Sequence, residues 1–170
     1  MGVETRACGK TSLFLVPVAI SILSAPAIVS PRPLFVWNLT ASAPLGLFRV
    51  VRTDHLQRGD LVIASLSAGW QRYAVQRHYL AEHVFLVKYV AALAGDRLCV
   101  RGALLEINGH GAAIRRPTDG AGRPLPAWQG CRRVGASDVL LLNGGRPDSF
   151  DGRYFGPTPR ADILGRAVRL

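Results

Sequence analysis

Residues 83–93 read His-Val-Phe-Leu-Val-Lys-Tyr-Val-Ala-Ala-Leu, and this stretch decides how the chain is expected to fold. Its β-branched and aromatic residues favour an extended strand, on which successive side chains point to opposite faces. On such a strand Lys88 shares a face with Leu86 and Val90, so its amine is predicted to be surrounded by apolar side chains. Burying an ammonium group is unfavourable unless it is paired or loses its proton. The stretch therefore predicts a β core and a lysine with unusual chemistry.

The chain on both sides of this strand follows the same pattern. Short apolar segments bounded by Gly, Pro or Asp indicate further strands at 34–38, 46–52, 60–66 and 138–143. Asn108-Gly109 follows the apolar run 104–107 and is typical of a hairpin turn, because both residues accept positive φ. Residues 70–82 are predicted to form one amphipathic helix, and the Pro- and Gly-rich residues 111–130 an extended loop. We expect a mainly β, antiparallel domain with a small helical insert.

Composition limits the class of protein. The chain has 170 residues, of which 49% are hydrophobic, and a net charge of +10, which fits one folded domain and excludes a mainly disordered chain. Three cysteines are too few for a four-thiolate zinc site or a disulfide-dense scaffold. The histidines show no metal-ligand spacing, so no metal or other cofactor is expected.

The basic residues are almost all arginine. Lys10 and Lys88 are the only lysines among 21 basic residues. Arginine stays protonated in proteins, whereas a buried lysine can become neutral and act as a general base. Lysine at position 88 therefore suggests a catalytic amine. The alternative is an ordinary lysine at a strand edge whose amine reaches water.

The first 30 residues have the pattern of a membrane-targeting segment. Arg6 and Lys10 lie in residues 1–12, and residues 13–29 carry no charge. As a helix this uncharged run spans about 25 Å, slightly less than a hydrocarbon core. We interpret 1–12 as cytoplasmic, 13–30 as a transmembrane signal anchor and 31–170 as an exported domain. A secretory signal cleaved near Ala25-Pro26-Ala27 and a buried core helix are the alternatives.

Export changes the interpretation of two cysteines. Cys99 and Cys131 fall in the exported part, where disulfides persist, whereas Cys8 is expected on the cytoplasmic side. A bond between Cys99 and Cys131 would stabilise the fold by roughly 3–4 kcal/mol. Two separately buried thiols are the alternative.

A serine provides a candidate nucleophile. Ser42 lies in Asn38-Leu-Thr-Ala-Ser42-Ala-Pro44, where a rigid turn could hold its hydroxyl at an exposed bend. The Ser42 N–H and the Thr40 hydroxyl are candidate oxyanion-hole donors. An ordinary turn serine is the alternative.

A third polar group lies in Asp148-Ser149-Phe-Asp151-Gly-Arg153. In an extended chain Ser149, Asp151 and Arg153 would point to one side, with Ser149 able to hydrogen-bond a neutral amine and the other two able to pair. The alternative is a surface loop with a weak ion pair.

Together these segments resemble the type I signal peptidase family, the Ser–Lys membrane serine proteases. The similar motifs, in chain order, are Ser42-Ala-Pro44, Arg58-Gly-Asp60-Leu-Val-Ile63, Lys88-Tyr-Val-Ala-Ala-Leu-Ala-Gly95-Asp96 and Ser149-Phe-Asp151-Gly-Arg153-Tyr-Phe-Gly156. Gly122-Arg-Pro-Leu-Pro126 and the spacing from Cys99 to Cys131 look like the conjugative-transfer, TraF-type branch. Ala43, Tyr89 and Ala94 differ from the residues usual in the housekeeping enzymes, and none of these departures removes a catalytic group.

The resemblance implies a signal-peptidase-type β fold and a role for each candidate residue. Ser42 would be the nucleophile, Lys88 the general base, and Thr40 with Ser42 the oxyanion hole. Ser149 would orient Lys88, and Asp151 with Arg153 would support the site.

The resemblance also implies a setting. The protein would be a single-pass protein of the bacterial inner membrane with a periplasmic catalytic domain and no cofactor. Its substrates would be exported precursors, pilin-like or belonging to a secretion apparatus, with small residues before the cut.

Two rival functions remain. An inactive scaffold of a secretion or conjugation apparatus would leave Ser42 and Lys88 far apart. A self-cleaving Ser–Lys repressor-type domain would need a DNA-binding domain and a cytosolic chain, which residues 1–33 argue against. The arginines are scattered, so we expect contact with anionic lipid headgroups and no specific nucleic acid.

Overall fold

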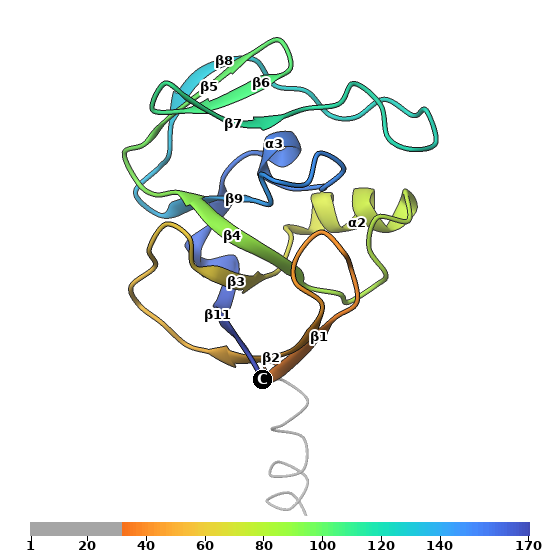
Figure 1. Cartoon of the computed structure of the whole chain (residues 1–170), viewed down its shortest axis with the longest axis vertical. Coiled ribbons are helices and arrows are strands. Elements are labelled where there is room, and N and C mark those ends of the chain that lie inside the picture. The colour runs from red at the N-terminus through yellow and green to blue at the C-terminus, as the bar shows by residue number, and fades with distance from the viewer. Residues whose placement is uncertain (1–31) are drawn as a thin grey trace, which may run out of the picture. The chain divides into compact units, whose positions relative to one another are not determined.

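The computed structural model describes residues 32–170 (Figure 1). The predicted cytoplasmic segment 1–12 and transmembrane anchor 13–30 lie outside these residues. Among residues 32–170, no helix is both long and apolar enough to cross a bilayer. The fold of the described residues is mainly β, and every strand pairing in it is antiparallel, as the sequence predicts.

A seven-stranded sheet forms the larger part of the fold (Figure 1). Its strands, in spatial order, are β1 (Phe35–Asn38), β2 (Gly46–Val51), β11 (Ile163–Arg169), β3 (Leu61–Ala64), β4 (Leu86–Ala92), β9 (Asp138–Leu142) and β10 (Thr158–Pro159). Strand β4 is the one expected around Lys88, and it lies between β3 and β9. Both faces of β4 are covered, because Leu86 and Val90 join one buried cluster while Val87 joins another.

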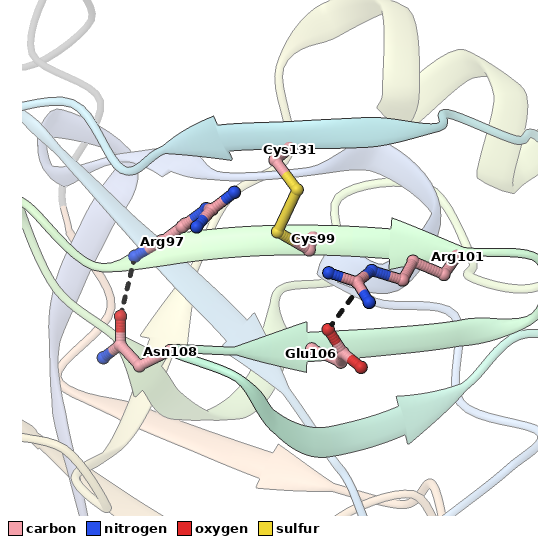
Figure 2. The surroundings of a disulfide bond; sticks show 6 residues. All are labelled: Arg97, Cys99, Arg101, Glu106, Asn108 and Cys131. Atoms are coloured by element: carbon pink, nitrogen blue, oxygen red, sulfur yellow. Dashed lines mark hydrogen bonds and ion pairs between the residues drawn. A yellow bond between two sulfur atoms is a disulfide. The ribbon is translucent and has the colours of Figure 1, made fainter.

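A four-stranded sheet packs at the opposite end from β1 and β2 (Figure 1). Its strands, in spatial order, are β7 (His110–Ile114), β6 (Leu104–Ile107), β5 (Arg97–Arg101) and β8 (Gly130–Arg133). A disulfide joins Cys99 of β5 to Cys131 of β8, which face each other in the strand register (Figure 2). On the other side of β5, an ion pair of 3.7 Å joins Arg101 to Glu106 of β6, so side-chain contacts tie β5 to both neighbours.

The helical insert is shorter than predicted. Helix α2 spans Ala68–Gln76, whereas the sequence suggests a helix over 70–82. The chain leaves the helix because His78 adopts a left-handed conformation, with a φ of 59°, and the Tyr79 N–H turns back to the Ala74 carbonyl. A single-turn helix, α3 (Gly152–Phe155), and a 3₁₀ turn, η1 (Arg160–Asp162), complete the elements.

Two segments differ from the sequence prediction. The predicted loop 111–130 begins as strand β7, which continues to Ile114 because Ala113 pairs with Leu105 and is buried in the core of the small sheet. Strand β11 was not predicted, although it lies between β2 and β3. Gly165 permits this position, because a Cβ atom there would lie only 2.6 Å from the Val51 carbonyl oxygen.

Candidate active site

Ser42 lies in the turn between β1 and β2, and one buried amide side chain organises that turn. Asn38, the last residue of β1, is 5% exposed. Its Nδ2 lies 3.0 Å from the Thr40 carbonyl oxygen, 2.9 Å from that of Pro44 and 3.3 Å from that of Ala43. These contacts fold the segment 40–44 around the Asn38 side chain.

The same amide also contacts Thr40 through its oxygen. Asn38 Oδ1 accepts hydrogen bonds from the Thr40 N–H at 3.1 Å and from the Thr40 hydroxyl at 2.8 Å. Thr40 Oγ1 in turn lies 3.4 Å from Ser42 Oγ. The turn therefore presents the Thr40 and Ser42 hydroxyls next to each other.

Lys88 approaches this turn from the middle of β4, where it pairs with Val62 of β3. Its side chain is nearly buried, as the residue is 4% exposed. The Lys88 Nζ atom lies 3.3 Å from Ser42 Oγ and 2.8 Å from Ser149 Oγ. Two serine hydroxyls from distant parts of the sequence thus meet at one amine.

The burial of Lys88 alters its acidity. Loss of water around the amine lowers its pKa from 10.5 to about 8, because desolvation disfavours the charged form. The nearby Asp151 carboxylate raises the pKa, and the Arg153 guanidinium lowers it further. At pH 7 about a tenth of such molecules carry a neutral amine, compared with well under 1% for an exposed lysine.

Asp151 and Arg153 form a completely buried ion pair. Arg153 donates from Nε to Asp151 Oδ1 at 2.8 Å and from a terminal nitrogen to Asp151 Oδ2 at 2.9 Å, and both side chains are 0% exposed. The sequence predicts an extended chain here, and that prediction is wrong, because Arg153 lies in helix α3. Asp151 caps the N-terminus of α3 by accepting the Arg153 N–H, which brings the two side chains together across the start of a helix.

This pair also connects three parts of the fold. Arg153 donates to the carbonyl oxygens of Ile114, at the end of β7, and Asn143, directly after β9. The Asn143 N–H donates to Asp151 Oδ2 at 2.9 Å. The ion pair therefore fixes the loop that carries Ser149, whose side chain is 2% exposed.

Ser42, Lys88 and Ser149 line one cleft, which has a volume of about 620 Å³. The segments 36–42 and 84–88 form further parts of its lining. Another part of its wall contains Tyr79, whose hydroxyl donates to Asp119 at 2.6 Å, and Phe150, whose ring stacks on Tyr154. Among the described residues, no group of three or more His, Cys, Asp or Glu side chains could hold a metal ion.

Sequence reasoning passed over Asn38, Asn143 and Phe150, which the structure places at this site. Asn38 had one visible signal, since an asparagine that ends an apolar strand often organises the following turn through its side chain. Phe150 lies between two polar candidates, and only the fold reveals its contacts with the rings of Tyr73 and Tyr154.

Comparison with known proteins identifies the family. The family described as signal peptidase, peptidase S26, matches residues 7–170. A probable conjugal transfer protein TraF from Sinorhizobium fredii is 38% identical over 146 residues, covering 78% of this chain and 74% of that protein. A plasmid transfer protein TraF from Escherichia coli is 32% identical over 138 residues, covering 75% of this chain and 77% of that protein.

Two further matches are named signal peptidase I. Signal peptidase I from Leptolyngbya laminosa is 29% identical over 115 residues, covering 66% of this chain and 51% of that protein. A signal peptidase I structure from Enterococcus faecalis V583 aligns with a TM-score of 0.39 at 20% identity, covering 68% of this chain and 98% of that one. The family match over nearly the whole chain and the TraF relatives lead to one assignment: the chain belongs to the type I signal peptidases, peptidase family S26, in their TraF-type branch.

Proposed function

We propose that the protein is a membrane-anchored serine endopeptidase that removes leader segments from exported precursors, using Ser42 and Lys88. The observation that carries this proposal is the distance of 3.3 Å between Lys88 Nζ and Ser42 Oγ, at a lysine that is 4% exposed. An inactive scaffold would have no need to bury an amine beside a serine hydroxyl.

The proposed reaction is acyl transfer. Neutral Lys88 takes the proton of the Ser42 hydroxyl as Ser42 Oγ attacks the carbonyl carbon of the scissile bond. The resulting oxyanion is stabilised by the Ser42 N–H and the Thr40 hydroxyl. The protonated lysine then gives its proton to the leaving amine, and the C–N bond breaks. Neutral Lys88 then takes a proton from water, whose oxygen attacks the acyl-enzyme carbonyl carbon. The bond from that carbon to Ser42 Oγ breaks, Lys88 returns the proton to Ser42, and the second product leaves.

The remaining residues have supporting roles in this proposal. Ser149 lies 2.8 Å from Lys88 Nζ and can accept a hydrogen bond that directs the amine lone pair toward Ser42. The buried pair of Asp151 and Arg153 holds the Ser149 loop against β9 and β7. An Asp151 charge close to Lys88 also stabilises the protonated amine that forms during the reaction.

The proposed substrate is an extended peptide with small residues before the cut. The segments 36–42 and 84–88 both line the cleft, and we expect an extended chain bound there to hydrogen-bond as an added strand. The TraF relatives make precursors of a conjugation or secretion apparatus the natural candidates. We place the catalytic domain on the periplasmic side of a bacterial inner membrane, held there by the predicted anchor at 13–30.

The decisive test compares active-site variants of the full chain in detergent or vesicles. The substrate is a set of quenched peptides with alanine before the scissile bond, and mass spectrometry locates the cut. Ser42→Ala and Lys88→Ala are expected to reduce cleavage at least 1,000-fold while retaining the thermal unfolding midpoint within a few degrees. Ser67→Ala provides the matched control, because Ser67 is exposed, makes no capping bond and lies outside the cleft. Cleavage by Ser42→Ala at the wild-type rate would refute the proposal.

The pH profile tests the role of Lys88 separately. With a pKa of about 8, the neutral fraction of the Lys88 amine falls about tenfold for each pH unit below that value. The value of kcat/KM at pH 6 should therefore be roughly 100-fold below its alkaline plateau. Lys88→Arg should be inactive across the range, because a guanidinium stays protonated. A profile without a rise between pH 6 and 9 would contradict a lysine base.

A further inference from the structure

We propose that Asn38 is a positioning residue that sets the geometry of Thr40 and Ser42 for the tetrahedral intermediate. This inference rests on the proposed peptidase function. The Asn38 side chain makes contacts with three carbonyl oxygens, one N–H and one hydroxyl, all within six residues of it in sequence. Because these partners all belong to the turn at 40–44, the influence of Asn38 on the reaction is transmitted through that turn.

The contacts require an amide. The Nδ2 group offers two N–H donors, which point toward the carbonyl oxygens of Thr40, Ala43 and Pro44. The Oδ1 atom accepts from the Thr40 N–H and hydroxyl. An aspartate would place a charged oxygen against the three carbonyl oxygens, and an alanine would leave all of these groups without their partner at a nearly buried position.

The position of the Thr40 hydroxyl explains why the reaction would depend on Asn38. In the structure this hydroxyl donates to Asn38 Oδ1 at 2.8 Å and lies 3.4 Å from Ser42 Oγ. To stabilise an oxyanion, the hydroxyl hydrogen must rotate away from Asn38. Oδ1 then still accepts the Thr40 N–H at 3.1 Å, so it is not left without a donor. Asn38 thus fixes the oxygen of Thr40 while leaving its hydrogen free to turn.

This arrangement predicts a specific kinetic signature. The contacts of Asn38 position groups that meet the oxyanion, and the polar atoms of its side chain are engaged by the turn at 40–44, so they are not left to bind the substrate chain. Loss of Asn38 should therefore lower kcat with little change in KM. Because the Asn38 side chain bonds to the turn and not to the Lys88 amine, the pH midpoint near 8 should remain unchanged.

The test uses Asn38→Ala and Asn38→Asp in the full chain. We measure kcat, KM and the inhibition constant of a peptide aldehyde ending in alanine, whose carbonyl can add to Ser42 Oγ to give a tetrahedral hemiacetal. Both variants are expected to lose roughly 10- to 100-fold in kcat and to bind the aldehyde weaker by a similar factor, with KM within about threefold of the wild type. All constants are measured well below the unfolding midpoint of each variant, where nearly all of the enzyme is folded, because partial unfolding would itself weaken apparent inhibitor binding.

Asn108→Gly is the matched control. Asn108 also uses both ends of its amide, accepting the Arg97 N–H and donating to Asp96, but it lies in the turn between β6 and β7, outside the cleft (Figure 2). Its φ of 53° makes glycine the substitution without backbone strain. We expect this variant to lower the unfolding midpoint and leave kcat and aldehyde binding within about twofold of the wild type.

A double variant identifies the path of the effect. In a Thr40→Val background, Asn38→Ala should cost less in kcat than it does alone, because the donor that Asn38 positions is already absent. Unchanged aldehyde binding in both Asn38 variants, or an equal weakening in Asn108→Gly, would overturn the inference. If Ser42→Ala cleaves as well as the wild type, the proposed function itself fails, and this inference falls with it.

Discussion

Lys88 places an ionisable amine at a buried position, where it lowers the stability of the fold. It occupies a position on β4 between Leu86 and Val90, where an aliphatic side chain would complete a buried cluster. The amine is satisfied there by two serine hydroxyls, but neither carries a compensating charge. The lowered pKa shows that burial of this amine costs stability. A group that resists protonation in the folded state destabilises that state at every pH at which the unfolded chain would be protonated.

Lys88→Met is therefore expected to stabilise the fold while removing activity. The pKa change from 10.5 to about 8 corresponds to about 3 kcal/mol at pH 7, and the loss of hydrogen bonds to Ser42 and Ser149 reduces the net gain to roughly 1–2 kcal/mol. The unfolded chain binds the extra proton up to pH 10.5, so wild-type stability rises between pH 8 and 10.5. Urea unfolding at pH 7 and pH 10 should show the advantage of methionine shrinking at high pH. An advantage that grows with pH would contradict this account.

The candidate residues differ in how visible they are in the sequence. Lys88 stands out because a charge interrupts an apolar strand, and Ser42 because a rigid turn follows it; the structure brings both to one cleft with Ser149. Asn38 did not stand out, because its partners are main-chain carbonyl oxygens whose positions depend on the folded turn. The Asp151 and Arg153 pair could be named, but its complete burial could not, since it depends on the packing of β7, β9 and α3 around it.

At the scale of the element, α3 is held by an unusually close approach to β9. A Cβ atom on Gly152 would lie 2.8 Å from both the Leu141 carbonyl oxygen and the Leu140 Cδ1 atom. Because Gly152 is the first residue of α3, any displacement there would move the Asp151 cap and the Arg153 side chain.

Gly152→Ala is expected to destabilise the protein by roughly 1–3 kcal/mol, since a backbone oxygen cannot yield to the added methyl group. The same change at Gly69, in the first turn of α2, meets nothing within 4 Å and should stabilise by up to about 1 kcal/mol, because alanine favours a helix. Thermal unfolding of the two variants provides the measurement. Equal shifts in the same direction would show that the close approach to β9 does not matter.

Elements were predictable where burial and periodicity agree. The strands at 35–38, 46–51, 61–64, 86–92 and 138–142 fall inside the apolar runs of the sequence. Strand β11 escaped prediction because Gly165 and Arg166 interrupt its apolar pattern, and its place is determined by pairing on both edges, with β2 and with β3. Helix α2 ends early because His78 adopts a left-handed conformation, at a position that glycine occupies more often and therefore marks more clearly in a sequence.

At the scale of the whole molecule, the disulfide and the Lys88 amine belong to different sheets. The bond between Cys99 and Cys131 joins two strands of the small sheet at a sequence separation of 32, while Lys88 lies on β4 of the large sheet and Ser42 in the turn between β1 and β2. Stability and activity should therefore respond differently to its removal.

Replacing both cysteines by serine is expected to lower the free energy of unfolding by roughly 3–4 kcal/mol, on the chain-entropy model. Well below the unfolding midpoint, cleavage should stay within about threefold of the wild type. Denaturant titrations and peptide cleavage on the same samples check both statements, with dithiothreitol-treated wild type as a second route to the reduced state. A variant that is fully stable, or one that is folded but inactive, would contradict this separation.

The placement of β11 has a consequence for the order of events during synthesis. Among the described strands, residues 163–169 form the only hydrogen-bonded link in the large sheet between β2, on the Ser42 side, and β3, next to the Lys88 strand. A growing chain that has not yet produced these residues can form the β1–β2 and β3–β4 strand pairs, but it cannot join them into one sheet. We therefore expect the serine and the amine to acquire their fixed separation only once residue 169 has been made. Under the proposed function, a chain that ends before these residues would be unable to cut its neighbours, because its serine and amine are not yet held together.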